Sequence, residues 1–228
     1  MLVLGLISEG PTDAAVIGAV LSGICSDFRI HPVHPELDES GIMQDGPNEH
    51  GYGWRGIKAF CEAIHDNITE FLASIASEPL DGLLIHVDCS MAHNVGAEHS
   101  CPSPLTTANA LSEVIQGQWL SLTVPRSDVL VITPSKEIEA WIVAGLCAPR
   151  ARMIPIECDF NIAAELIGIG LVKRKNGELK KSQRKYIDKK ADIATAAYRI
   201  INGCETAKLF HEQICEFHKF KLCGLAVA

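Results

Sequence analysis

Short apolar runs alternate with longer amphipathic segments up to about Gly145. The short runs are bounded by turn-forming residues, which is typical of buried strands. We expect one strand to begin at Leu2 and end before Glu9, and others at residues 28–34, 82–88 and 128–133. Apolar positions three and four residues apart predict helices at residues 12–23, 54–76, 107–120 and 136–145, the last capped by Ser135.

The pattern changes after Gly145, where no further strand is indicated and helices are expected at residues 161–167, 189–201 and 205–220. Strands alternating with helices, followed by helices alone, predict an α/β fold with a mainly parallel sheet flanked by helices and a helical C-terminal extension. We place the α/β domain at residues 1–148. A basic segment and C-terminal helices packed on that domain take up residues 149–228. Long loops are expected at residues 38–52 and 89–104.

Acidic residues follow three of the expected strands. Glu9 ends the first and precedes Gly10, Asp88 ends the third, and Glu137 and Glu139 follow the last. The carboxyl ends of parallel strands share one edge, where open α/β sheets bind ligands, so we expect these carboxylates to gather there. Taken singly, each acid also has a structural explanation, as a favourable charge at a helix start or as a turn residue.

The composition indicates one sizeable α/β domain that stays out of membranes. The chain has 228 residues, of which 47% are hydrophobic. No segment approaches the ~20 apolar residues of a membrane span, and the first apolar run meets Glu9 without a basic leader, so a cytoplasmic protein is expected. Nine cysteines, an odd number without a Cys-x-x-Cys pair, indicate reduced thiols.

Charge is unevenly distributed along the chain. The formal net charge of −8 disfavours a polyanionic partner, yet residues 173–190 contain nine Lys and Arg against two acids. Such a segment favours contact with a nucleic-acid backbone, although a solvated loop has the same composition. The residues assigned to that contact are Lys173, Arg174, Lys175, Lys180, Lys181, Arg184 and Lys185.

Two of the acidic segments resemble the motifs of a known fold. Glu9-Gly-Pro-Thr-Asp13 and His86-Val-Asp88-Cys-Ser90 resemble the TOPRIM domain of topoisomerases, bacterial primases, recombination mediators and OLD-type nucleases. With Glu137-Ile-Glu139-Ala-Trp141, the chain looks closer to small bacterial TOPRIM-like proteins related to the OLD-type nucleases. The resemblance covers residues 1–145 by motif order and implies a TOPRIM-like sheet.

The resemblance also implies a divalent-metal-dependent nuclease, with Glu9 and Asp88 as catalytic residues and Glu9 as the general acid or base. The implied ligands of Mg²⁺ or Mn²⁺ are Glu9, Asp88, Glu137 and Glu139. Gly10, Asp13, Ser90 and His93 are the implied supporting residues. Hard oxygen ligands suit magnesium, and a metal held by carboxylates stabilises charge on a phosphoryl group under attack. By analogy of fold, a role in defence against phage or plasmid is expected.

One departure from the family pattern leaves two other functions open. The family's second motif is Asp-x-Asp, whereas this chain has Asp88-Cys89-Ser90, so Glu137 or Glu139 would have to complete the metal shell. A degenerate site would make the protein a regulatory module that binds nucleic acid or nucleotide without cleaving it. A small-molecule phosphohydrolase is the second alternative, and in it the basic segment would be idle.

The sequence also indicates partners of the protein and two candidate zinc sites. We expect DNA rather than RNA, bound through backbone contacts that are insensitive to sequence, with a protein partner subunit selecting the target. The oligomeric state is not specified. Two sets of soft ligands are weaker zinc candidates, and Cys89 is also a weak candidate nucleophile. The zinc sets are Cys89, His93, His99 and Cys101 in one loop, and His211, Cys215, His218 and Cys223 near the C-terminus.

Overall fold

A four-stranded parallel sheet forms the centre of the computed structural model, with strands in the order β2–β1–β3–β4. The structure describes residues 1–38, 40–43, 50–75, 79–98, 103–148, 154–159, 162–176 and 178–225. The strands are β1 (Leu2–Ile7), β2 (Phe28–His34), β3 (Gly82–His86) and β4 (Val129–Ile132). The expectation of an α/β fold with a parallel sheet flanked by helices is thereby confirmed.

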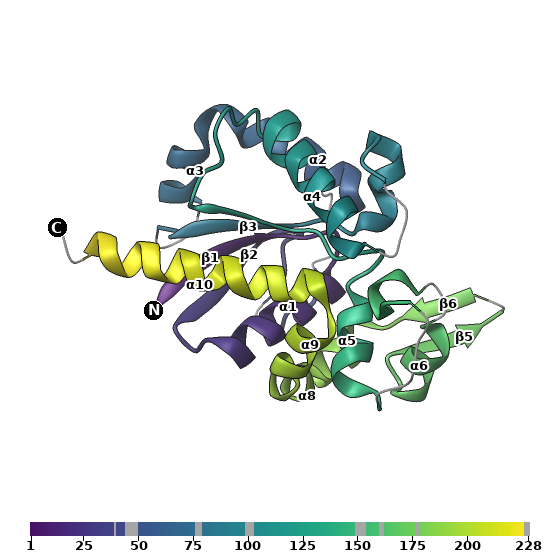
Figure 1. The fold of residues 1–228 in the computed structure, drawn as a ribbon. Coiled ribbons are helices and arrows are strands. Elements are labelled where there is room, and N and C mark those ends of the chain that lie inside the picture. The colour runs from purple at the N-terminus through teal and green to yellow at the C-terminus, as the bar shows by residue number, and fades with distance from the viewer. Residues whose placement is uncertain are drawn as a thin grey trace.

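Helices cover both faces of this sheet (Figure 1). One face carries α2 (Gly53–Ile64), α3 (Ile68–Ser74) and α4 (Pro104–Val114), and the other carries α1 (Pro11–Ile24) and α10 (Glu205–Leu225). Successive side chains of a strand point to opposite faces, so Leu4 and Leu6 join the core beneath α1, while Val3 and Ile7 join the core beneath α2. Burial on both faces explains why the strands are continuous apolar runs.

The C-terminal helices pack on the α/β part through a shared core. Leu166, Ile193, Ile200 and Phe210 belong to the same buried cluster as Leu4 of the central strand. The division at residue 148 stays a prediction, because residues 149–153 lie outside the described part of the chain. The C-terminal helices are α6 (Ala163–Gly168), α7 (Gln183–Asp188), α8 (Lys190–Thr195), α9 (Ala197–Gly203) and α10, whereas α5 (Glu139–Leu146) follows β4 within the α/β part.

The basic segment is ordered, which corrects the expectation that strands end after Gly145. It forms an antiparallel hairpin of β5 (Val172–Lys175) and β6 (Glu178–Lys181), followed directly by α7. Seven of the eight hairpin side chains are exposed, and Val172 is the buried one. A hairpin with solvent on both faces has no apolar alternation, so its strands could not be recognised from the hydrophobic pattern.

Three further expectations need correction. The helix expected at residues 54–76 is interrupted by a 3₁₀ turn, η1 (His65–Asn67), and residue 76 lies outside the described part. Ser135 does not cap a helix, because Lys136 has a φ of 66° and α5 begins only at Glu139. The loop expected after Asp88 contains a 3₁₀ segment, η2 (Cys89–Val95).

Shorter turns complete the described elements. The expected helix at residues 107–120 divides into α4 and a π turn, η3 (Ile115–Trp119), and a last 3₁₀ turn is η4 (Ile156–Cys158). Residues 44–49, within the loop expected at 38–52, lie outside the described part. None of the helices in the described ranges is both long and apolar enough to cross a bilayer.

Candidate functional site

The carboxyl edge of the sheet brings the predicted acids together. Glu9 follows β1, Asp88 follows β3, and Glu139 opens α5 after β4, while Asp13 lies in the first turn of α1. The strand order changes direction between β1 and β3, which is the point where open α/β sheets form a ligand crevice. We call Glu9, Asp13, Asp88, Glu137 and Glu139 the acidic edge.

Glu9 and Asp88 meet directly across the two central strands. The backbone N–H of Asp88 donates a 2.8 Å hydrogen bond to Oε1 of Glu9, and the carbonyl of Glu9 accepts one of 3.3 Å from Gly53. Burial raises the pKa of Glu9, and the Asp88 carboxylate raises it further, against the opposing effect of His86. The Glu9 side chain is therefore fixed in position and holds a proton more readily than an exposed glutamate.

Asp88 is nearly buried and has a charged neighbour from its own strand. Nε2 of His86 lies 3.2 Å from Oδ1 of Asp88 in an ion pair, and the same oxygen accepts a 3.0 Å hydrogen bond from the amide of Ile138. Burial raises the pKa of Asp88 to about 6 in spite of His86. Burial lowers the pKa of His86, but Asp88, Asp13 and Glu9 outweigh it and bring the value to about 9.

Glu139 is fully buried and bridges the sheet to the basic hairpin. Nζ of Lys181 lies 2.6 Å from Oε1 of Glu139, and the hydroxyl of Tyr186 donates a 2.9 Å hydrogen bond to the same oxygen. Oε2 of Glu139 has no hydrogen-bond partner among the described residues. Burying a carboxylate oxygen without a hydrogen-bond partner costs free energy, unless another group binds that oxygen.

The remaining acids increase the negative charge around Glu139. Burial raises the pKa of Asp13 to about 6, with Glu139 and Glu9 adding to the effect and His86 and Lys181 opposing it. Burial also raises the pKa of Glu137, whose Oε2 lies 4.0 Å from Nζ of Lys181. Burial lowers the pKa of Lys181, but the carboxylates around it reverse the shift and raise it. The carboxyl groups of the acidic edge thus share the cations of Lys181 and His86.

The acidic edge has the ligand chemistry for a hard divalent cation but is not closed around one. Within the described ranges, no three acidic or imidazole groups of this edge have ligand atoms that all lie within 4.8 Å of one another. His86 and Lys181 lie beside Asp88 and Glu139 and supply positive charge there. A divalent cation fits the orphaned oxygen of Glu139 and the surplus of carboxylates, provided that the side chains move inward.

Two of the predicted supporting residues, Ser90 and His93, lie in the 3₁₀ segment η2 that follows Asp88. The amide of Ser90 donates to the carbonyl of Lys136, and Nδ1 of His93 lies 3.1 Å from the carbonyl of Ser90 inside its own turn. Both side chains are exposed. Gly10 precedes α1, and a β-carbon there would lie 3.6 Å from Oδ2 of Asp13, an ordinary van der Waals distance, so Gly10 lies beside that acid.

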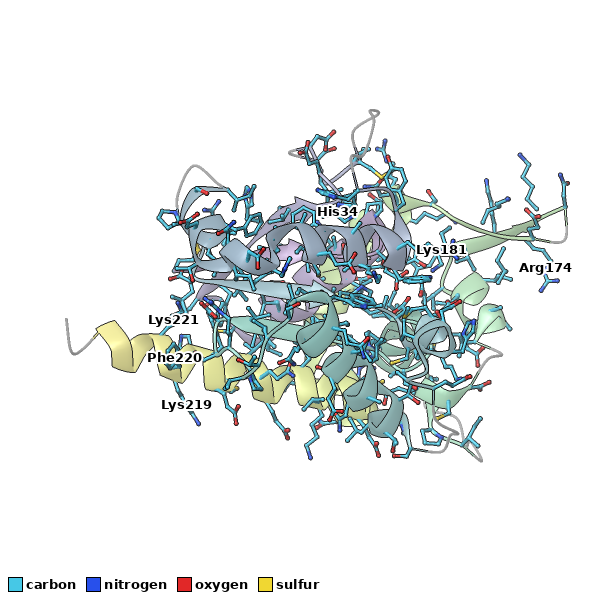
Figure 2. The ribbon with its side chains drawn as sticks, turned by 90° about the horizontal axis from the view of Figure 1, so that it is seen from above. His34, Arg174, Lys181, Lys219, Phe220 and Lys221 are labelled. Carbon is cyan, nitrogen blue, oxygen red and sulfur yellow. The ribbon has the colours of Figure 1, made fainter. Side chains whose placement is uncertain are left out.

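Three of the predicted basic residues contact other groups of the protein, and four others have exposed side chains. Lys181 reaches Glu139, Lys180 pairs with Glu178 at 2.6 Å, and Lys185 donates to the carbonyl of Gly170. The side chains of Lys173, Arg174, Lys175 and Arg184 are exposed. Figure 2 shows Lys181 close to the body of the molecule and Arg174 near the far end of the hairpin.

Both candidate zinc sets lie only partly within the described residues, so they stay predictions. His99 and Cys101 lie outside the described residues, as does the side chain of Cys223. Sγ of Cys89 donates to the carbonyl of Thr133, and burial raises its pKa, which disfavours a nucleophilic thiolate. His211 lies 3.5 Å from Cys215, whereas His218 faces a different group of residues.

Sequence reasoning missed three parts of this site. His86 belongs to the second motif, but no role was predicted for it. A histidine inside an otherwise apolar strand could have indicated a polar partner at this edge of the sheet. Tyr186 and the contact of Lys181 with Glu139 depend on how the hairpin folds back, and no local pattern reports that.

Comparison with known proteins identifies no relative. No protein-family model, curated protein or solved structure matches the chain.

Proposed function

We propose that the protein is a divalent-metal-dependent phosphodiesterase of TOPRIM type that cleaves nucleic acid. The observation that carries the proposal is the meeting of Glu9 and Asp88 at the change in strand order, beside the buried Glu139 with its orphaned oxygen. Such a surplus of largely buried carboxylates favours a divalent cation, and raised pKa values in a cluster of titratable groups are typical of functional sites.

Asp88, Glu137 and Glu139 would hold Mg²⁺ or Mn²⁺, with Glu9 beside them. The ion supplies Lewis-acid stabilisation of charge on the phosphoryl group. Glu9 exchanges the proton: its raised pKa lets it accept a proton from the attacking water or return one to the leaving oxygen. The Asp88 amide fixes Oε1 of Glu9 for this task.

The hairpin gives the substrate class, which we propose to be a polymer and DNA in particular. Cross-strand neighbours lie on the same face, so Arg174 and Leu179 share a face with Val172 and Lys181, while Lys173 and Lys180 lie on the other. One face therefore carries a guanidinium at the outer end and an ammonium beside the acidic edge. A phosphate backbone lying along this face would meet both cations on its way to Glu9. A partner subunit would select the target.

Glu9→Gln tests the catalytic proposal. With Mg²⁺ or Mn²⁺ and single-stranded, duplex or supercoiled DNA, cleavage should fall by at least about 100-fold, since proton transfer contributes about 10²–10⁴-fold. The melting temperature should be unchanged. Glu113→Gln, an exposed acid of α4, is the matched control and should cleave normally. Equal cleavage by Glu9→Gln and wild type would rule out the assignment.

The second candidate is a binding module without cleavage, and one observation favours it. His86 and Lys181 already neutralise part of the acidic edge, and the exposed Ser90 does not replace the second aspartate of the family motif. Retention of DNA by wild type without cleavage at any divalent metal would support this module. Hydrolysis of nucleotides that is unaffected by neutralising Arg174 and Arg184, whose side chains are exposed, would support a small-molecule phosphohydrolase.

A further inference from the structure

A second group of metal-ligating side chains lies at the opposite edge of the sheet. Cys25, Asp27 and His218 each offer one ligand atom, and the three atoms all lie within 4.8 Å of one another. Within the described residues this is the one group of His, Cys, Asp or Glu that meets this condition. We call these three residues the Cys25 cluster.

Three separate elements supply the cluster, and each is anchored by its backbone or its ring. Cys25 caps the end of α1, where its amide donates a 2.9 Å hydrogen bond to the carbonyl of Leu21. The carbonyl of Asp27 accepts a 2.7 Å hydrogen bond from the amide of Leu2. The ring of His218, on α10, packs against Phe28 with centroids 5.5 Å apart. The side chains therefore approach one another from fixed positions.

The donor set indicates the kind of ion. A thiol sulfur, an imidazole nitrogen and a carboxylate oxygen together suit zinc, whereas magnesium prefers oxygen alone. Nε2 of His218 already lies 3.4 Å from Oδ2 of Asp27, which is close to the spacing of two ligands on one ion. Asp27 is exposed, while Cys25 and His218 are partly buried, so an ion can enter from solvent.

We propose that Cys25, Asp27 and His218 form a binding site for a zinc-like transition-metal ion, with water in the fourth position. A zinc–sulfur bond forms as the thiol proton passes to solvent. The bound ion would link α10, near the end of the chain, to the connection between α1 and β2. The site has an open position, because three protein ligands leave one of the four tetrahedral positions to water.

The cluster is remote from the acidic edge and differs from it in chemistry. β2 begins at Phe28, next to Asp27, so the cluster lies at the amino edge of the sheet, whereas Glu9 and Asp88 lie at the carboxyl edge. A strand of this length spans roughly 20 Å at ~3.3 Å per residue. Figure 2 shows Lys219, the neighbour of His218, far from Lys181.

Cobalt substitution tests the proposal in the full chain. The protein is freed of metal with a chelator and titrated with Co²⁺, which gives a near-ultraviolet charge-transfer band when a thiolate binds it. We expect the band to saturate at one Co²⁺ per chain and to disappear on adding Zn²⁺. Cys25→Ser should lose the band, and Cys215→Ser, which changes an exposed thiol one turn before His218, should keep it.

Two further measurements make the result decisive. Zn²⁺ should raise the melting temperature of the wild type but not that of His218→Gln. After removal of metal with a chelator, the variants should have the same melting temperature as the wild type. Glu9→Gln should keep the cobalt band, so a failure of the proposed function would leave this result unaffected. Absence of a band in the wild type, or its survival in Cys25→Ser, would overturn the proposal. Loss of the band in Cys215→Ser would assign the thiolate to the His211–Cys215 pair instead and would also overturn it.

Discussion

His86 opposes the rise in the pKa values of three acids of the acidic edge, Glu9, Asp13 and Asp88. It has no exposed surface, and neither ring nitrogen makes a well-aligned hydrogen bond within the described residues, although Nε2 lies 3.2 Å from Asp88. A buried imidazolium is stable here because carboxylates surround it, which raises its pKa to about 9. Its charge limits the repulsion between Glu9 and Asp88.

His86→Gln should change how the free energy of unfolding depends on pH. A folded-state pKa of about 9, above the ordinary 6.5, means that protonated His86 stabilises the fold below pH 6.5 and that this contribution is lost as pH rises through 9. The wild-type free energy of unfolding should fall by on the order of 3 kcal/mol over that interval. His86→Gln should remove this fall, and the exposed His93→Gln should retain it. Urea titrations at several pH values measure the difference.

Asp13→Asn should have the opposite dependence on pH. The pKa of Asp13 is raised to about 6, so ionisation of this buried carboxyl destabilises the fold as pH rises from 3.8 through 6. The amide has no such cost, so Asp13→Asn should be more stable than wild type at pH 8, by about 3 kcal/mol. The two proteins should have equal stability near pH 4. A variant less stable than wild type at pH 8 would contradict this account.

Among the elements, the β5–β6 hairpin connects the basic segment to the acidic edge. Lys181, at the base of the hairpin, contacts Glu139 and pairs with Val172 across the two strands. Arg174 lies on the same face of the hairpin, two residues after Val172. The hairpin therefore carries both a contact with the site and the exposed charges expected to meet a nucleic acid.

Neutralising the outer hairpin should weaken DNA binding without changing the site. Arg174→Ala should lower the affinity for duplex DNA, and the slope of log K against log salt should decrease by roughly 0.9 for each phosphate that the variant no longer neutralises. Lys208→Ala, an exposed lysine of α10, is the control and should leave the slope unchanged. Fluorescence anisotropy across a salt series measures both quantities. An unchanged slope in Arg174→Ala would exclude this face of the hairpin from the interface.

The elements also show what could and could not be predicted from the sequence. β1 and α1 were predictable because burial on both faces leaves a continuous apolar run and a helical stripe. The break at His65–Asn67 was not, because Ile64 and Ile68 continue the same apolar stripe through it. The meeting of Glu9 with Asp88 followed from strand ends, whereas the contact of Lys181 with Glu139 depends on tertiary packing of the hairpin.

At the scale of the whole molecule, the C-terminal helices are held against the α/β part by close helix packing. A β-carbon at Gly23 of α1 would lie 2.2 Å from the carbonyl oxygen of Ala194 in α8 and 2.7 Å from the β-carbon of Ala197. The first of these neighbours is backbone, so it cannot move without shifting α8. Glycine is therefore required for the observed distance between the two helices.

Gly23→Ala should destabilise the entire molecule, by about 1–3 kcal/mol, because the added methyl group forces α1 and α8 apart. Gly18→Ala is the matched control in the same helix, since nothing lies within 4 Å of a β-carbon there. It should be neutral or stabilising by up to about 1 kcal/mol. Chemical denaturation of both variants gives the comparison. Equal stabilities would contradict the close contact of α1 with α8.

The central place of β1 has a consequence for biosynthesis. β1 pairs with β2 on one side and with β3 on the other, and Leu4 is in register with Gly82. One edge of this strand therefore stays unpaired on the ribosome until β3 has emerged, and the nascent chain must keep that apolar edge from aggregating in the meantime. Glu9 gains its hydrogen bond from Asp88 at that same stage, so the acidic edge forms only once translation has passed β3.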